Sequence, residues 1–146
     1  MGEFLKIIHT LPVKACPYKH RTAEMLLESQ INIKRAYADR AIIPEDIEVA
    51  AGRLAEPSSF GRDEVVIHGD YCLPNIIMKD FHLQGFVDLG NGGIGDRHYD
   101  LFWGLWTLEF NLGTGKYGNH FLEAYGIDQV DPQRLELCRL LAGFTE

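Results

Sequence analysis

The sequence predicts an α+β domain that is mainly helical and contains a small antiparallel hairpin. Apolar residues recur at three- and four-residue spacing over several long stretches, as they do in amphipathic helices. Short apolar runs bounded by turn residues occur at 65–67, 76–78 and 83–87, as in β-strands. The chain has 146 residues, 46% of them hydrophobic and 11% aromatic, so we expect a single domain, 1–146, with a substantial core.

Three helices are predicted before the first strand. The first is amphipathic and stops at Pro12. The second extends from about Thr22 to Ala38. Its predicted core-facing residues are Ala23, Leu26, Leu27, Gln30, Ile31, Lys34 and Tyr37. The third is predicted to begin at Pro44, because proline suits the first helical position, and to end before Pro57. A surface linker, 58–61, would follow.

The strands are predicted to bring two polar residues together. One strand, 76–78, is followed by a polar connection, 79–82, and by a return strand, 83–87. If the hairpin is centred between Phe81 and His82, Asn75 lies directly opposite Asp88, because both residues are equally far from the turn. We therefore expect these two side chains to be neighbours at the open end of the hairpin.

Three further helices are predicted after the hairpin. Residues 99–112 are apolar on most sides and should form a buried helix that ends at the glycines of 113–115. A short helix is expected at 121–125. Asp131 and Pro132 provide an N-cap and a first helical residue for a last helix that extends to about Leu141.

Asp70, Asn75 and Asp88 indicate magnesium-assisted phosphoryl transfer. This reaction needs oxygen ligands for the metal ion and a carboxylate that positions the attacking hydroxyl. An amide oxygen from Asn75 and a carboxylate from Asp88 are suitable ligands for Mg²⁺ when phosphate oxygens complete its shell. Asp70 lies five residues before Asn75, in a loop whose Gly69 and Pro74 favour irregular backbone, and it is the candidate general base.

Residues 90–95 also match G-x-G-x-x-G, the pattern of a dinucleotide-binding turn. Asp88 would place a carboxylate against the pyrophosphate, and no parallel strand is predicted to follow. We therefore interpret these glycines as a tight turn behind the metal ligand.

The segment 96–100 contains several ionisable residues. Asp96 is predicted to cap the helix that follows, and Asp100 to be a buried acceptor for loop amides. His98 is expected to face solvent, His68 to be packed and hydrogen bonded, and the other histidines show no metal-ligand spacing. The aromatic residues Phe102, Trp103, Trp106 and Phe110 are interpreted as core, with a ligand-stacking platform as the alternative.

Composition narrows the functional classes. A net charge of −7 and a pI near 5.3 argue against nucleic acid or an anionic membrane surface as a partner. The sign suits a cationic substrate, but many soluble cytosolic proteins are equally acidic, and this ordinary acidity is the stronger interpretation. The cysteines Cys16, Cys72 and Cys138 are odd in number and widely spaced, which indicates reduced thiols in a cytoplasmic protein. The sequence has no apolar run of about 18 residues, the length expected of a membrane span.

These motifs resemble the aminoglycoside phosphotransferases, and most closely the 3'-phosphotransferases. The similar segments, in order, are Leu11-Pro12, Cys16-Pro17-Tyr18, HGDYCLPN at 68–75, GFVDLGNGGIGDRHYDL at 85–101, Tyr125-Gly126-Ile127, Arg134 and Leu140-Leu141. The resemblance implies the C-terminal lobe of a protein-kinase-like fold, with Asp70 as the catalytic base and Asn75 and Asp88 as magnesium ligands. It also implies that His68 and Asp100 support the catalytic loop.

The chain departs from that family in three places. No N-terminal lobe with a nucleotide-covering loop and a phosphate-binding lysine is present, so we expect the chain to begin at the first helix of the C-terminal lobe. Asn91 stands where close relatives usually have arginine, and the acidic, aromatic tail of the relatives is replaced by Ala142-Gly143-Phe144-Thr145-Glu146.

The function expected from the resemblance is ATP-dependent transfer of a phosphoryl group to a hydroxyl of an aminoglycoside, with Mg²⁺ as cofactor. Glu109 and Glu146 are candidates to bind the ammonium groups of this cationic substrate. The isolated chain is expected to be inactive and able to self-associate through an exposed cleft. Two alternatives remain: a related kinase acting on a sugar, a choline-like amine or a macrolide, and a non-catalytic remnant.

Overall fold

The computed structural model describes residues 1–18, 20–54, 60 and 64–145. Its α-helices are α1 (Gly2–His9), α2 (Arg21–Lys34), α3 (Ile47–Leu54), α4 (Arg97–Leu112), α5 (Gly118–Tyr125) and α6 (Pro132–Thr145). Its strands are β1 (Glu64–Ile67), β2 (Ile76–Lys79), β3 (His82–Phe86) and β4 (Gly93–Asp96). The predicted class, mainly helical with small antiparallel pairing, is confirmed.

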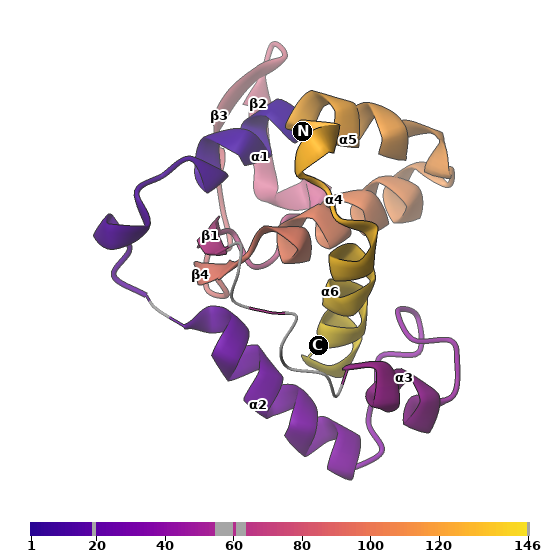
Figure 1. The fold of residues 1–146 in the computed structure, drawn as a ribbon. Coiled ribbons are helices and arrows are strands. Elements are labelled where there is room, and N and C mark those ends of the chain that lie inside the picture. Colours follow the sequence, from indigo (N-terminus) through magenta and orange to yellow (C-terminus); the bar gives the residue numbers. More distant parts are fainter. Residues whose placement is uncertain (19, 55–59, 61–63, 146) are drawn as a thin grey trace.

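Helix α4 lies at the centre of the molecule and packs against α5, α6 and β1 (Figure 1). Helix α6 also contacts α2 and α3, and α1 packs on α5 and β1. The fully buried side chains come from nearly all of these elements and include Leu5, Met25, Ile43, Ile67, Tyr71, Tyr99, Leu101, Tyr125, Leu140, Leu141 and Phe144. The helices therefore surround one continuous core, which holds β1 and the N-terminal half of α4 in place.

The predicted core face of α2 was wrong. Leu27 and Ile31 are 63% and 50% exposed, whereas Met25, Thr22 and Ser29 are buried. Two of the three buried residues have hydroxyl groups whose hydrogen bonds are satisfied locally or by β4, so hydrophobicity alone could not identify this face. The third helix was also predicted too early: α3 begins at Ile47, after a turn in which the Asp46 side chain accepts backbone hydrogen bonds.

The strands form two antiparallel pairs, β1 with β4 and β2 with β3. The prediction missed β4, because its glycines resemble a turn. A Cβ at Gly95 would lie 2.6 Å from the Ile67 side chain and 3.0 Å from Thr22 Oγ1, so glycine suits the close packing of β4 at this position. Since the described strands contain no parallel pair, the architecture also excludes the dinucleotide-binding interpretation of residues 90–95.

The C-terminal helices agree with the prediction, with small changes at their ends. Gly113, at φ +63°, ends α4, and Asp131 accepts a hydrogen bond from Gln133 N at the start of α6. Phe102 and Trp103 belong to the core as expected, but Phe110 is 69% exposed and stacks on Trp106 with 4.7 Å between ring centroids. In the part of the chain that the structure describes, no helix is both long and apolar enough to span a bilayer.

Candidate active site

The loop after β1 places Asp70 and Asn75 in direct contact. The Asn75 Nδ2 group donates to the Asp70 carboxylate Oδ2 at 2.8 Å and to the Asp70 carbonyl oxygen at 3.0 Å. Both residues are half-buried, and Asn75 ends a short 3-10 helix, 73–75. With Nδ2 engaged by Asp70, the amide oxygen of Asn75 remains as the acceptor atom of this side chain.

Asp100 binds the beginning of the same loop from α4. Its carboxylate accepts hydrogen bonds from the backbone amides of His68, at 2.7 Å, and Gly69, at 2.8 Å. Asp100 is fully buried, and the predicted contact of a buried acceptor with loop amides is therefore present. Two hydrogen bonds from adjacent amides hold the loop at a fixed position on α4.

His68 is fully buried, and its Nδ1 lies 3.3 Å from the Asp70 backbone nitrogen. Its ring has edge contacts with Tyr71 and Phe86, with 6.0 Å between centroids in each case. The ring is thus packed and hydrogen bonded, as the sequence suggested. Its Nε2 has no hydrogen-bond partner within the described residues.

Gly69 determines how closely the loop approaches the segment after β3. Its φ is +83°, and a Cβ at this position would lie 2.0 Å from the Asn91 carbonyl oxygen. Any other L-residue would be strained both by its backbone conformation and by this contact. Gly69 therefore allows the loop containing Asp70 to lie directly on the segment that follows Asp88.

The predicted pairing of Asn75 with Asp88 was wrong by one residue. The observed register pairs Ile76 with Phe86, and Val87 N donates to Asn75 O at 3.0 Å, so Asn75 lies opposite Val87. The turn is centred on Asp80 and Phe81, which both have positive φ, and this alone would place Asn75 opposite position 86. The register shifts back by one residue between Ile77 and Met78, where Gln84 of β3 is the extra residue.

Asp88 is the next residue after Val87, so its backbone still lies close to Asn75. It is exposed and has a φ of +60°, a conformation that non-glycine residues rarely adopt and that often occurs at functional sites. Joint binding of Mg²⁺ by the Asn75 amide oxygen and the Asp88 carboxylate, with water or phosphate as the other ligands, stays a prediction. No cluster of three or more His, Cys, Asp or Glu that could hold a metal ion occurs among the described residues.

The two candidate substrate-binding residues have different outcomes. Glu109 is exposed near the C-terminal end of α4, and its carboxylate lies beside Gly115. Glu146 lies outside the described residues. The structure therefore leaves their role as a prediction.

An apolar cavity of about 370 Å³ lies between the end of α1 and the segment after β3. Its lining includes Ile8, Leu11, Tyr18, Phe86 and Leu89. Several rim residues are largely exposed, Tyr18 at 68% and Leu89 at 54%. This is the apolar surface to which the predicted self-association would apply, and the prediction stays untested.

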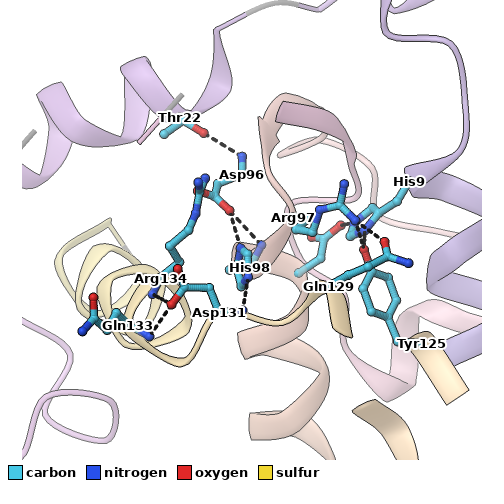
Figure 2. A network of polar contacts seen from close by, with 11 residues as sticks. His9, Thr22, Asp96, Arg97, His98, Tyr125, Gln129, Asp131, Gln133 and Arg134 are labelled. Atoms are coloured by element: carbon cyan, nitrogen blue, oxygen red, sulfur yellow. Dashed lines mark hydrogen bonds and ion pairs between the residues drawn. The ribbon is translucent and has the colours of Figure 1, made fainter. Parts of the chain in front are cut away.

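A second polar network fixes the junction of β4, α4 and α6 (Figure 2). Asp96 caps α4 and binds both His98 Nδ1, at 2.8 Å, and the Arg134 guanidinium. His98 Nε2 accepts from Asp131 N at 2.9 Å. His98 is fully buried, so the expectation that it faces solvent was wrong. The spacing of residues in the sequence could not show that the His98 ring lies between the Asp96 carboxylate and the Asp131 backbone amide.

Burial alone would raise the pKa of Asp96, but hydrogen bonds from His98 and Arg134 outweigh it and hold the pKa below its ordinary value. The carboxylate is therefore kept charged at the N-terminus of α4, where negative charge is stabilised by the helix dipole.

Sequence reasoning missed two residues near the site. His9 has no metal-ligand spacing in the sequence, yet it contacts Asp100. Thr107 Oγ1 accepts from Leu73 N at 3.1 Å and so supports the loop from α4. A polar residue inside an otherwise apolar helical stretch was the available signal for Thr107, whereas only the fold brings His9 to Asp100.

The mainly helical fold with its small antiparallel hairpin is that of solved phosphotransferases. A profile of the Phosphotransferase enzyme family matches residues 1–138. The chain therefore belongs to this family.

Relatives with assigned names agree with this family assignment. The chain is 38% identical over 141 residues to a probable aminoglycoside 3'-phosphotransferase of Lactococcus lactis, covering 94% of this chain and 54% of the relative. It is 32% identical over 138 residues to an aminoglycoside 3'-phosphotransferase of Niallia circulans, covering 92% and 53%. The chain thus spans about half the length of these relatives.

Solved structures support the fold. Aminoglycoside phosphotransferase APH(3'')-Id from Streptomyces rimosus superimposes with a TM-score of 0.83 at 27% identity, covering 99% of this chain and 59% of that one. The same enzyme in complex with ADP and streptomycin gives a TM-score of 0.77 at 27% identity, covering 99% of this chain and 60% of that one.

Proposed function

We propose that this chain is the catalytic lobe of an ATP-dependent phosphotransferase that modifies a hydroxyl group of an aminoglycoside. The observation that supports this most directly is the contact of Asn75 with Asp70, in a loop held by Asp100 and adjacent to the segment of Asp88. The names of the relatives support the substrate class, and the neighbour bound to ADP and streptomycin supports a nucleotide and a cationic acceptor.

In this proposal Asp70 is the general base. Its carboxylate orients the acceptor hydroxyl and accepts its proton, while Asn75 fixes the carboxylate through Oδ2. Asn75 Oδ1 and the Asp88 carboxylate would hold Mg²⁺. When bound, the ion would neutralise charge on the phosphates of ATP. His68 and Asp100 position the loop, and Glu109 and Glu146 are assigned, more weakly, to substrate ammonium groups.

The chain by itself should have little activity. Phosphoryl transfer depends on positioning, and the chain spans only about half the length of the relatives that it matches. The three widely spaced cysteines suit a reducing compartment, so we propose that the protein is cytoplasmic.

Paramagnetic NMR tests the metal site without requiring turnover. Mn²⁺ with ATP, added to the labelled chain, should broaden the amide signals around Asn75 and Asp88, and Asp88→Asn should weaken this effect. Asp80→Asn, a change of the same kind at an exposed turn residue, is the control. Broadening elsewhere, or equal broadening in Asp88→Asn, would contradict the assignment.

A substrate panel tests the acceptor. The DNA upstream of the codon for Met1 should be read for a nucleotide-binding segment, and a form that includes this segment should be assayed with ATP. We expect turnover with aminoglycosides and none with choline or a macrolide. Turnover with only the latter acceptors would favour a related kinase, and none with any acceptor would favour a non-catalytic remnant. Rapid turnover by the isolated chain would refute its predicted inactivity.

A further inference from the structure

His9 is a buried residue that the proposed mechanism has not yet used. It is the last residue of α1, and its side chain is 3% exposed. Its Nε2 lies 3.1 Å from Asp100 Oδ2, and its Nδ1 lies 2.8 Å from the Tyr125 hydroxyl. The ring thus connects α1 and α5 to the carboxylate that binds the loop.

The partners of Asp100 determine which nitrogen of His9 has the proton. Two backbone amides donate to the Asp100 oxygens, and the oxygens of a carboxylate act only as acceptors. His9 Nε2 must therefore be the donor. In the neutral ring Nδ1 then accepts from the Tyr125 hydroxyl, whose oxygen accepts from Arg97 Nη1 at 3.1 Å, as Figure 2 shows.

This arrangement fixes the orientation of the carboxylate. His9 and the His68 amide share Oδ2, while the Gly69 amide uses Oδ1, so rotation of the Asp100 carboxyl group would break at least one of the three contacts. The His9 ring itself is held edge-on to the Tyr125 ring, with 5.5 Å between centroids and an interplanar angle of 83°.

We propose that His9 is a positioning residue for the active-site loop. It acts through Asp100 on the amides of His68 and Gly69 and so on the placement of Asp70. The importance of this role for catalysis rests on the proposed function, whereas the contact itself can be tested separately.

Hydrogen exchange gives the direct test. In the 146-residue chain, His9→Leu should accelerate exchange of the His68 and Gly69 amides by about tenfold or more relative to amides in the β1–β4 ladder. His9→Gln, whose amide nitrogen can replace Nε2 as a donor, should stay within about threefold of the wild-type chain. His120→Leu, at an exposed histidine, is the matched control and should change neither amide.

Two results would overturn the proposal. One is unchanged exchange at His68 and Gly69 in His9→Leu, and the other is equal acceleration at these amides and in the ladder, which is what loss of general stability produces. The wild-type chain gives a further check if His9→Leu does not fold. Its imidazole ¹⁵N spectrum should show a proton on His9 Nε2, and a neutral ring protonated only on Nδ1 would refute the assignment.

Kinetics then connect this contact to the reaction. In a form that shows phosphotransferase activity, His9→Leu should lower kcat by about tenfold or more and change the KM for ATP by less than about threefold, with recovery in His9→Gln. A loss of kcat that His9→Gln does not recover would overturn the positioning role. If the exchange results hold but the wild-type form transfers no phosphate, the proposed function fails and the structural contact stands.

Discussion

The side-chain amide of Asn75 donates a 2.8 Å hydrogen bond to the carboxylate of Asp70. The two residues are five positions apart, so the loop between them is closed by its own side chains. Because the second hydrogen bond from Nδ2 goes to the Asp70 carbonyl oxygen, both the backbone and the side chain of Asp70 are held before any ligand binds. This local closure makes the loop testable by stability measurements as well as by activity.

Removing the amide of Asn75 should destabilise the chain. Asn75→Ala eliminates two hydrogen bonds to Asp70, one of them to a charged group, and should lower the free energy of unfolding by about 1–3 kcal/mol. Urea denaturation provides the measurement. Asn119→Ala, at an exposed position of α5, should have a much smaller effect, and equal losses in the two variants would show that the Asn75 contact contributes little.

Adding one methyl group at Gly69 should be strongly unfavourable. The new Cβ would lie 2.0 Å from Asn91 O at a φ of +83°, so we expect Gly69→Ala to lower stability by at least about 1–3 kcal/mol. Gly52→Ala is a matched control in α3, where no atom lies within 4 Å of the new methyl, and it should be stabilising by about 0.5–1 kcal/mol. The measurement is the melting temperature of each variant. Similar melting temperatures in Gly69→Ala and Gly52→Ala would contradict the tight packing at Gly69.

Acid should weaken the junction of α4 and α6 through Asp96. Its pKa in the folded chain is lower than the ordinary value of 3.8, so the folded state binds fewer protons than the unfolded state. The stabilisation is therefore complete above that value and is lost as the pH falls through the folded-state pKa. In Asp96→Asn the melting temperature should be lower at pH 7 and should fall less steeply with acidification than in the wild-type chain.

The control for this pH dependence is Asp80→Asn, at an exposed turn position. Its melting temperature should fall with acidification as steeply as that of the wild-type chain. Glu45 and Glu136 also have a lowered pKa, for each of which a hydrogen bond from Arg139 is the main cause, so part of the acid sensitivity should remain in Asp96→Asn. An unchanged slope in Asp96→Asn would show that this carboxylate does not contribute.

The three cysteines should react at different rates. Cys138 is fully buried, and burial together with nearby Asp96 raises the pKa of its thiol, which suppresses the reactive thiolate. A thiol reagent at neutral pH should therefore label Cys16 and Cys72, both half-buried, at least about a hundredfold faster than Cys138. All three thiols should react together in denaturant. If all three thiols reacted with the reagent at one rate in the folded chain, this result would contradict the burial of Cys138.

Local chemistry made much of this molecule predictable. Asp131 and Pro132 marked the start of α6, Gly113 marked the end of α4, and Asp96 was identified as a cap, because each depends on neighbours within a few residues. The grouping of Asp70 with Asn75 was likewise accessible, since both lie in one short loop.

Errors arose where a position depends on distant partners. The buried face of α2 is set by α6 and β4, and Gly95 of β4 fits closely against Ile67 of β1. Hydrophobic spacing contains no information on such contacts. The hairpin register was wrong for a local reason, because Asp80 and Phe81 both adopt a positive φ in the turn.

The sequence by itself determined the phosphotransferase family, and the residue types and spacing of Asp70, Asn75 and Asp88 predict a hard-oxygen site for Mg²⁺. Only the tertiary structure decided how that loop is held. His9 and Asp100 are separated by 91 positions along the chain and meet at 3.1 Å because α1 and α4 both pack around β1. Hydrogen bonds between buried groups require a specific fold to bring them together, whereas a ligand's preference for oxygen donors can be deduced from the side chains alone.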